Sequence, residues 1–220
     1  CGQNSLGVME GINAARKVGA TAVPLNYRLT DDEAAYVVDH SDATVVYVDA
    51  EFAPLFVRIV DELPKVERII VFDGALPDGS PESMVAVAPL AAAAPDAAVV
   101  PEEDAADGGA TMIYTSGTTG KPKGALRRTA RDPAQSRAML EFIGYRPDDV
   151  YLTTGPLYHS GPGGFMAIGL AMGQTIVMQR KFDPEDWLRL VETHRVTSTF
   201  SAPTPIRMIT NLPGDVKARY

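Results

Sequence analysis

The chain has 220 residues, 45% hydrophobic and 22% charged, which is the balance of an ordinary globular protein and excludes wholesale disorder. Twenty Lys and Arg against 28 Asp and Glu give a net charge of −8, so no binding to nucleic acid is expected, and binding to anionic lipid is also opposed. Cys1 is the only cysteine, which excludes an internal disulfide and a cysteine-based zinc cluster and predicts a cytoplasmic location.

The first third of the chain alternates between helix and strand patterns. Thr30 followed by Glu33 forms the capping-box signal for a helix that runs to about His40. In chain order, the patterns predict an opening helix that ends at Gly19, a strand at 20–25, the capped helix, a strand at 44–48, a helix at 51–63 and a strand at 67–72.

Residues 73–107 carry five prolines and two acidic clusters, which is typical of an excursion or linker. Within them, the Ala-rich stretch 84–100 is either a surface helix or a disordered tether. Its prolines argue against a transmembrane segment, and none is expected in the chain. This region predicts a boundary between two lobes, roughly 1–105 and 106–220.

Alternation then resumes, and Asp183-Pro184 gives a second strong helix start. Strands alternating with helices predict an α/β fold with mostly parallel sheets flanked by helices, and such sheets bind ligands at the carboxyl ends of strands. The predicted strands are 110–115, 150–153, 175–179 and 196–201, and the predicted helices are 133–143, 164–172, 184–194 and one that begins near Pro205.

The loop after the strand at 110–115 has the composition of a phosphate cradle. Glycines allow backbone N–H groups to form an anion-binding nest, while hydroxyls and lysines supply hydrogen bonds and charge. The hydroxyls belong to Thr115, Ser116, Thr118 and Thr119, the glycines are Gly117, Gly120 and Gly124, and the lysines are Lys121 and Lys123.

Local charge supports the same interpretation. Residues 108–131 contain five basic residues and no acidic one, so the rest of the chain carries −8 − 5 = −13. A short positive stretch in an acidic protein suits a small polyanion. The alternative is a solvated Gly/Thr hairpin loop. Neither G-x-x-x-x-G-K-[ST] nor G-x-G-x-x-G occurs in the chain, which disfavours ordinary P-loop kinases and Rossmann dehydrogenases.

The segment Tyr114 to Gly124, Tyr-Thr-Ser-Gly-Thr-Thr-Gly-Lys-Pro-Lys-Gly, resembles the signature of the adenylate-forming (AMP-binding) superfamily, which includes acyl- and aryl-CoA synthetases, peptide-synthetase adenylation domains and luciferases. Val23 to Thr30 and Pro156 to Pro162 resemble two further segments of these enzymes, the latter their acyl-pocket loop. The resemblance covers essentially the whole chain and is strongest to bacterial fatty-acyl-CoA synthetases. It implies an internal part of the large amino-terminal domain.

The resemblance also implies an ATP site. In such enzymes this loop holds the β and γ phosphates while a carboxylate attacks the α phosphorus, so donors aimed at the leaving pyrophosphate lower the barrier. That role falls here to Ser116, Thr118, Thr119 and Lys123. Thr115, Gly117, Gly120, Lys121 and Gly124 complete the implied binding loop, although Lys121 could be solvated and Gly124 could serve only the return of the chain into the sheet. The implied small molecules are ATP, Mg²⁺ and CoA.

His159 lies in a Gly/Pro-rich loop and resembles the gate between acyl pocket and nucleotide site. It is not expected to act as a base, because a carboxylic acid is already ionised at neutral pH. Residues 154–165 contain no acid that could pair with a substrate ammonium group, which disfavours an amino-acid substrate. The implied substrate-binding residues are Tyr158, His159, Ser160, Gly161, Gly164, Phe165 and Phe200; the alternative for Phe165, Phe200 and Met166 is a place in the core.

The expected reaction is activation of a fatty or aryl carboxylic acid to an acyl adenylate and then an acyl-CoA thioester, with release of pyrophosphate and AMP. The alternatives are an acyl-AMP ligase that loads a carrier protein, a luciferase-type enzyme, and a non-catalytic nucleotide- or acyl-binding module. The family's magnesium-binding glutamate and its small carboxyl-terminal domain have no counterpart in these 220 residues. We therefore expect no metal ligand here, a chain that is inactive alone, and sheet edges that favour a homodimer.

Overall fold

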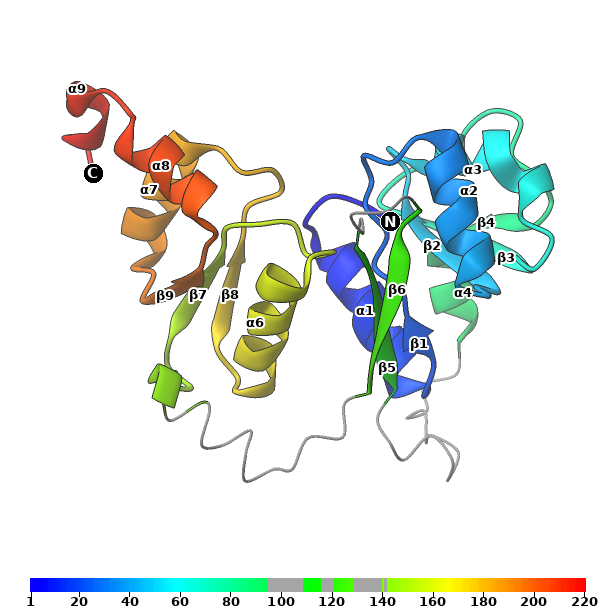
Figure 1. The fold of residues 1–220 in the computed structure, drawn as a ribbon, viewed down its shortest axis with the longest axis horizontal. Coiled ribbons are helices and arrows are strands. Elements are labelled where there is room, and N and C mark those ends of the chain that lie inside the picture. Colours follow the sequence, from blue (N-terminus) through cyan, green and yellow to red (C-terminus); the bar gives the residue numbers. More distant parts are fainter. Residues whose placement is uncertain (95–108, 116–120, 129–139, 141) are drawn as a thin grey trace. The chain divides into compact units, whose positions relative to one another are not determined.

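The computed structural model describes residues 1–94, 109–115, 121–128, 140 and 142–220, with the side chain of Arg128 left out. The chain divides into two compact units, Cys1–Ala130 and Arg131–Tyr220. The predicted helix at 133–143 lies largely outside the described residues. As expected, the fold is α/β with mainly parallel sheets and flanking helices (Figure 1).

One sheet of unit 1 is parallel, with the strand order β2-β3-β4. Successive side chains of a strand point to opposite faces of the sheet, and on one face of β2 and β3 the residues Val46, Val48, Ile69 and Val71 are buried. Together with Phe56 of α3 they form the apolar core of this unit. The elements around this sheet are α1 (Leu6–Lys17), α2 (Asp31–His40), β2 (Val45–Asp49), α3 (Ala53–Ile59) with a following 3₁₀ turn (Val60–Glu62), β3 (Arg68–Phe72), β4 (Met84–Ala86) and α4 (Val87–Ala93).

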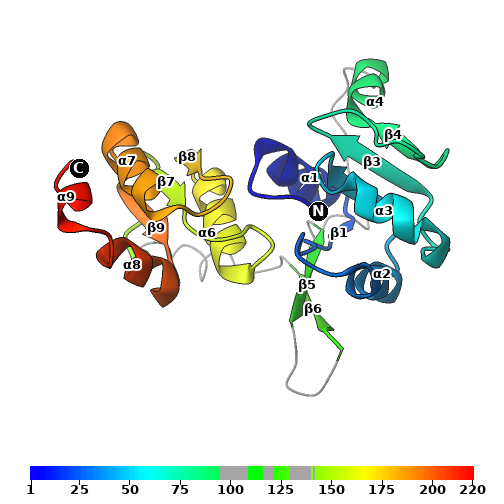
Figure 2. The same ribbon diagram turned by 90° about the horizontal axis from the view of Figure 1, so that it is seen from above.

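The second sheet of unit 1 holds the predicted phosphate loop. β1 (Thr21–Ala22) pairs in parallel with β5 (Ala110–Thr115), and β6 (Lys123–Arg128) runs antiparallel to β5, as Figure 2 shows from above. β6 was not among the predicted strands, because Lys-Gly-Ala-Leu-Arg-Arg lacks the alternation of a half-buried strand.

The described residues of unit 2 form a parallel sheet with the strand order β8-β7-β9. Leu152 of β7 packs with Val177 and with Leu190 of α7, whereas the neighbouring residue Tyr151 faces the opposite side, where α6 lies. Thus α7 and α6 cover opposite faces. The elements are β7 (Val150–Thr153), α6 (Ser160–Ala171), β8 (Thr175–Met178), α7 (Pro184–His194), β9 (Ser198–Phe200), α8 (Pro203–Thr210) and α9 (Gly214–Lys217).

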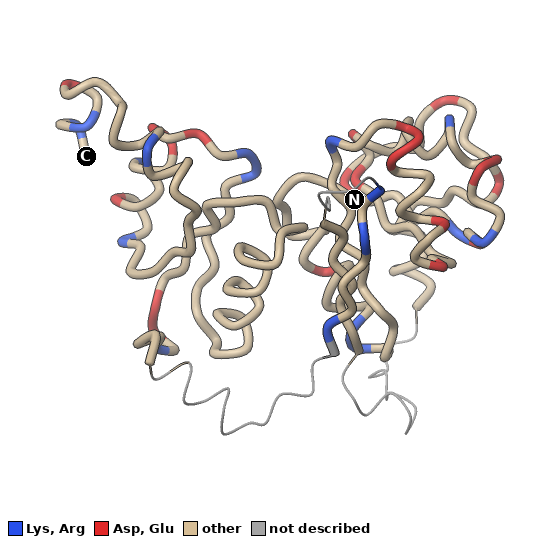
Figure 3. The backbone as a smooth tube through the Cα atoms, in the orientation of Figure 1, with Lys and Arg blue, Asp and Glu red and all other residues tan. Residues whose placement is uncertain are grey.

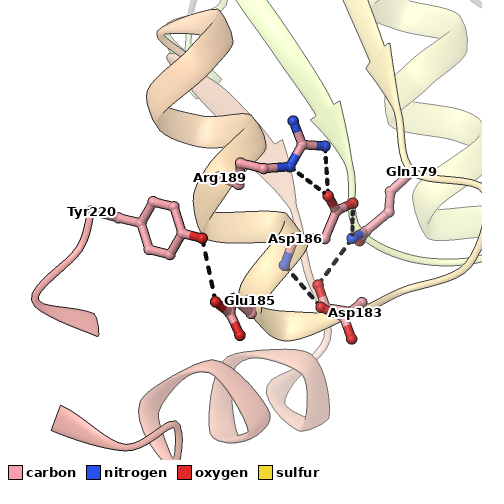
Figure 4. A network of polar contacts seen from close by, with 6 residues as sticks. All are labelled: Gln179, Asp183, Glu185, Asp186, Arg189 and Tyr220. Carbon is pink, nitrogen blue, oxygen red and sulfur yellow. Dashed lines mark hydrogen bonds and ion pairs between the residues drawn. The ribbon is translucent and has the colours of Figure 1, made fainter. Parts of the chain in front are cut away.

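Polar contacts fix the start of α7 (Figure 4). Asp183 caps the helix by accepting from the Asp186 N–H at 2.8 Å, as its sequence predicts. Gln179 Nε2, just beyond β8, donates to the Asp183 carbonyl and to Asp186 Oδ2, both at 2.9 Å. Arg189 then donates to Asp186 Oδ1 at 2.6 Å. The end of β8 and the first turns of α7 are therefore joined by directional hydrogen bonds.

Several predicted boundaries were wrong. α6 begins at Ser160, not near residue 164, and the predicted linker at 73–107 contains β4 and α4, so part of the Ala-rich stretch is helical. The compact units divide after Ala130, because β1 pairs with β5 and so holds residues 110–115 in unit 1. The lobe boundaries of the complete domain stay a prediction. None of the helices in the described part of the chain is long and apolar enough to span a membrane.

Candidate functional site

The predicted phosphate loop connects β5 to β6. Thr115 ends β5, Lys123 begins β6, and these two residues are paired across the hairpin. Both Lys121 and Lys123 are exposed. Ser116, Gly117, Thr118, Thr119 and Gly120 lie outside the described residues. Figure 3 shows basic residues towards both ends of β6 and acidic residues along α2. The described part of the hairpin therefore presents two lysines, Lys121 and Lys123, where the loop enters β6, and further positive charge at the opposite end of β6.

Gly124 has a packing role. A Cβ atom at this position would lie 2.8 Å from Met112 Sδ and 3.1 Å from Tyr114 Cζ, closer than ordinary van der Waals contact. The glycine therefore leaves space that side chains of β5 fill across the hairpin. This packing helps to place Lys123 opposite Thr115.

Helix α2 contacts the residues on either side of the loop. The Tyr36 hydroxyl donates to the Pro122 carbonyl oxygen at 3.3 Å, and Lys121 Nζ lies 4.6 Å from the centre of the Tyr36 ring. On the other side of the loop, His40 Nδ1 lies 2.8 Å from the Tyr114 hydroxyl. Tyr36 and His40 were not among the predicted site residues, because a helical periodicity does not reveal contacts with residues more than 70 positions away.

Burial raises the pKa of the Tyr114 phenol, with smaller contributions from Tyr36 and Asp42. The phenol therefore stays protonated near neutral pH and can share a hydrogen bond with His40 Nδ1, in which the tautomer of the imidazole decides the donor. Lys121 Nζ in turn lies over an aromatic ring, while the side chain as a whole is exposed.

The second predicted region begins at the amino terminus of α6. His159 is the residue before the first turn of this helix; it is exposed and its ring lies 4.4 Å from that of Tyr158, centre to centre. Ser160 and Gly164 are also exposed. These residues present polar and small groups on the surface of unit 2.

Aromatic rings pack behind that surface. Phe165 of α6 and Phe200 of β9 are stacked, with ring centres 4.5 Å apart and an interplanar angle of 15°. A Cβ atom on Gly161 would overlap the Phe200 ring, so this glycine permits the close approach of α6 to β9. Tyr145 meets the edge of Phe165 at 6.1 Å.

The structure thus brings together three of the predicted substrate residues, Gly161, Phe165 and Phe200. Phe165 and Phe200 are half-buried, whereas Met166 is only 3% exposed and belongs to the core. The loop that leads to α6 begins at Thr154, whose hydroxyl accepts from Trp187 Nε1 at 2.9 Å and shares a 2.6 Å hydrogen bond with Thr199. Within the described ranges, no three His, Cys, Asp or Glu side chains are grouped as a metal site would require.

The β5–β6 hairpin of unit 1 and the start of α6 in unit 2 carry the two segments whose sequences resemble adenylate-forming enzymes. The family model described as "AMP-binding enzyme" matches residues 1–220, and the chain belongs to that family.

Similar proteins include CoA ligases. The chain is 32% identical over 203 residues to the 3-hydroxybenzoate–CoA ligase of Aromatoleum sp. (strain CIB), covering 91% of this chain and 38% of that protein. It is 34% identical over 193 residues to 4-hydroxybutyrate–CoA ligase 2 of Metallosphaera sedula, covering 84% of this chain and 34% of that protein. It therefore spans little more than a third of the length of these relatives.

Solved structures show the same fold. A crystal structure from Rhodopseudomonas palustris CGA009, assigned as a long-chain-fatty-acid CoA ligase, superposes with a TM-score of 0.82 at 26% identity, covering 98% of this chain and 52% of that one. The predicted superfamily and fold class are thereby confirmed.

Proposed function

We propose that the protein containing this chain joins a fatty or aryl carboxylic acid to CoA. In the first step, a carboxylate oxygen attacks the α phosphorus of ATP, which forms an acyl adenylate and releases pyrophosphate. In the second step, the thiol of CoA attacks the acyl carbon, AMP leaves, and the thiol proton passes to solvent. The observation that carries the proposal is the paired Thr115 and Lys123 at the ends of a hydroxyl-rich loop whose neighbourhood, residues 108–131, contains no acid.

The loop's part in the first step is electrostatic. Negative charge grows on the leaving pyrophosphate, so hydrogen-bond donors and a cation placed beforehand stabilise the transition state more than the ground state. We assign this role to Ser116, Thr118, Thr119 and Lys123. Because Lys121 is already engaged by the Tyr36 ring, the structure favours Lys123 over Lys121 as the cation that meets phosphate.

Unit 2 is proposed to hold the acid. The half-buried Phe165–Phe200 stack offers an apolar surface to a ring or an alkyl chain. Gly161 lets α6 approach the Phe200 ring closely, and a Cβ atom at Gly164 would meet open space. Tyr158, His159 and Ser160 would line the approach. Binding and orientation are all that these residues need to provide, because the attacking carboxylate is ionised at neutral pH.

ATP is proposed to bind as its Mg²⁺ complex, and no step is assigned to a metal ligand of this chain. We further propose that residues 1–220 bind nucleotide but do not complete the reaction alone. The predicted cytoplasmic location and homodimer are tested by cell fractionation and by light scattering.

The test measures pyrophosphate release by the full-length protein with Mg²⁺ and ATP, across short, medium, long-chain and aromatic acids, each with and without CoA. Acid-dependent release with an acyl-CoA product is expected. Release without an acyl-CoA product would point to an acyl-AMP ligase, and ATP binding without release would point to a binding module.

Lys123→Ala provides the first variant. We expect a loss of about 100-fold in kcat/KM for ATP, the size measured when one transition-state donor is removed. Lys181→Ala, which removes an equal charge from an exposed position in unit 2, is the matched control and should leave the rate unchanged. Equal rates for the two variants would contradict the role of Lys123.

A further inference from the structure

One face of α2 is tied to both sides of the proposed phosphate loop. His40 lies 2.8 Å from the hydroxyl of Tyr114, the residue before Thr115, and the Tyr36 hydroxyl donates at 3.3 Å to the carbonyl of Pro122, the residue before Lys123. Each contact therefore falls one residue before a member of the Thr115–Lys123 pair.

The two contacts belong to a single rigid surface. Tyr36 and His40 are four residues apart, which places them on the same face of a helix, and their ring centres lie 5.2 Å apart. The His40 and Tyr114 rings meet edge to face at 5.8 Å. Lys121 adds a cation above the Tyr36 ring. The arrangement forms a continuous row of contacts from one side of the loop to the other.

α2 is itself firmly held. Its opposite face is buried in the core of unit 1 through Ala34, Ala35, Val37 and Val38. Thr30 and Glu33 close its first turn with reciprocal hydrogen bonds. The backbone of α2 is therefore held in place, and its side chains can position the residues at the ends of the loop.

We propose that Tyr36 and His40 are positioning residues that hold Thr115 and Lys123 in the arrangement that binds the β and γ phosphates of ATP. They act through Pro122 and Tyr114 and do not contact the nucleotide. This inference rests on the proposed function and assigns to α2 a part in nucleotide affinity.

The expected signature is specific to ATP. His40→Leu and Tyr36→Phe should each raise the apparent KM for ATP about 3- to 10-fold, the equilibrium equivalent of one hydrogen bond, while the KM for the acid stays unchanged. Tyr36→Phe keeps the ring beneath Lys121 and so tests the hydroxyl alone. Loss of general stability would instead lower the amount of active protein without changing either KM.

The pathway through Tyr114 is tested by a double-mutant cycle. If His40 acts through the Tyr114 hydroxyl, then His40→Leu combined with Tyr114→Phe should raise the KM for ATP no more than the larger single effect. His40→Asn, whose amide can still pair with the phenol, should recover most of the affinity. Multiplying effects in the double variant would overturn the coupling.

Asp39→Asn is the matched control on the same helix. It removes a surface ion pair, in which Lys65 Nζ lies 3.0 Å from Asp39 Oδ1, so it can lower the Tm without touching the loop. Its KM for ATP should equal that of the wild type.

The outcomes separate the two proposals. Binding of ATP is measured by calorimetry and acid-dependent pyrophosphate release by a coupled assay, all on folded full-length protein below its Tm. A wild type that neither binds ATP nor releases pyrophosphate overturns the proposed function and this inference together. An active wild type with unchanged KM for ATP in Tyr36→Phe and His40→Leu overturns the inference alone.

Discussion

Unit 1 and unit 2 are stabilised in different ways. Unit 1 buries a large apolar cluster in which Phe56, Val48 and Ile69 are 0% exposed. In the described part of unit 2, Leu152, Val177 and Leu190 form a smaller apolar cluster, and Tyr151, Leu157 and Met166 are buried outside it. Hydrogen bonds join β8, α7 and the Thr154 loop. Apolar burial contributes more free energy but is non-directional, whereas hydrogen bonds contribute less and fix orientation. We therefore expect the apolar cluster of unit 1 to contribute most to its stability, and the hydrogen bonds of unit 2 to fix the start of α7 and the loop at Thr154.

The largest effect is expected in the core of unit 1. Phe56→Ala should lower the free energy of unfolding by about 3–5 kcal/mol, because it removes a fully buried ring and leaves a cavity. Urea denaturation measures the change. Phe142→Ala, at a side chain that is 91% exposed, is the matched control and should have little effect. Comparable losses in the two variants would contradict the proposed dominance of the buried cluster.

A smaller effect is expected from the polar contacts of unit 2. Trp187→Phe keeps an aromatic ring but removes the 2.9 Å hydrogen bond to Thr154, so unfolding should become easier by about 1 kcal/mol. Tyr220→Phe is the control, since it removes only a long, exposed hydrogen bond of 3.4 Å to Glu185. If both variants unfold at the wild-type urea concentration, the Trp187–Thr154 hydrogen bond does not stabilise the unit.

The smallest expected effect is the pH dependence of the stability that Asp186 contributes. Burial tends to raise the pKa of Asp186, but hydrogen bonds from Gln179 and Arg189 and the charge of Arg189 outweigh it, so the pKa is lowered from 3.8. A lowered carboxyl pKa stabilises the folded state above pH 3.8, and this contribution is lost as the pH falls through the still lower folded value.

Asp186→Asn tests that contribution. The variant should have a lower Tm than the wild type near neutral pH, and the difference should shrink as the pH drops below about 4. Thermal unfolding across this pH range measures it, with Asp32→Asn, at an exposed position of α2, as the reference. A Tm difference that does not depend on pH would assign the effect to lost packing or capping.

The helix starts that depend on nearby residues were predicted best from the sequence. Thr30 and Glu33 gave the start of α2, and Asp183-Pro184 gave the start of α7, because a cap involves residues only three positions apart. The start of α6 was predicted too late, since Gly161, Gly163 and Gly164 have poor helix propensity. Tertiary packing overrides that propensity: side chains at Gly161 and Gly163 would overlap Phe200 and the Leu157 carbonyl.

The candidate site likewise has a part that the sequence predicted and a part that it did not. The signature from Tyr114 to Gly124 was readable from the sequence, and its ends lie together across the hairpin. The contacts of Tyr36 and His40 could not be predicted, because they depend on how α2 packs beside a strand 74 residues beyond His40. The roles of Ser116, Thr118 and Thr119 stay predictions.

The pairing of β5 with β6 has an entropic consequence. Joining the ends of a flexible segment normally costs conformational freedom, and a ligand that does the joining must supply that free energy from its own contacts. Here the hydrogen bonds of the hairpin already bring Thr115 and Lys123 together. The two ends of the loop are therefore already close together before an anion binds between them. The anion would not have to supply the free energy of loop closure, so more of its contact energy would contribute to its affinity.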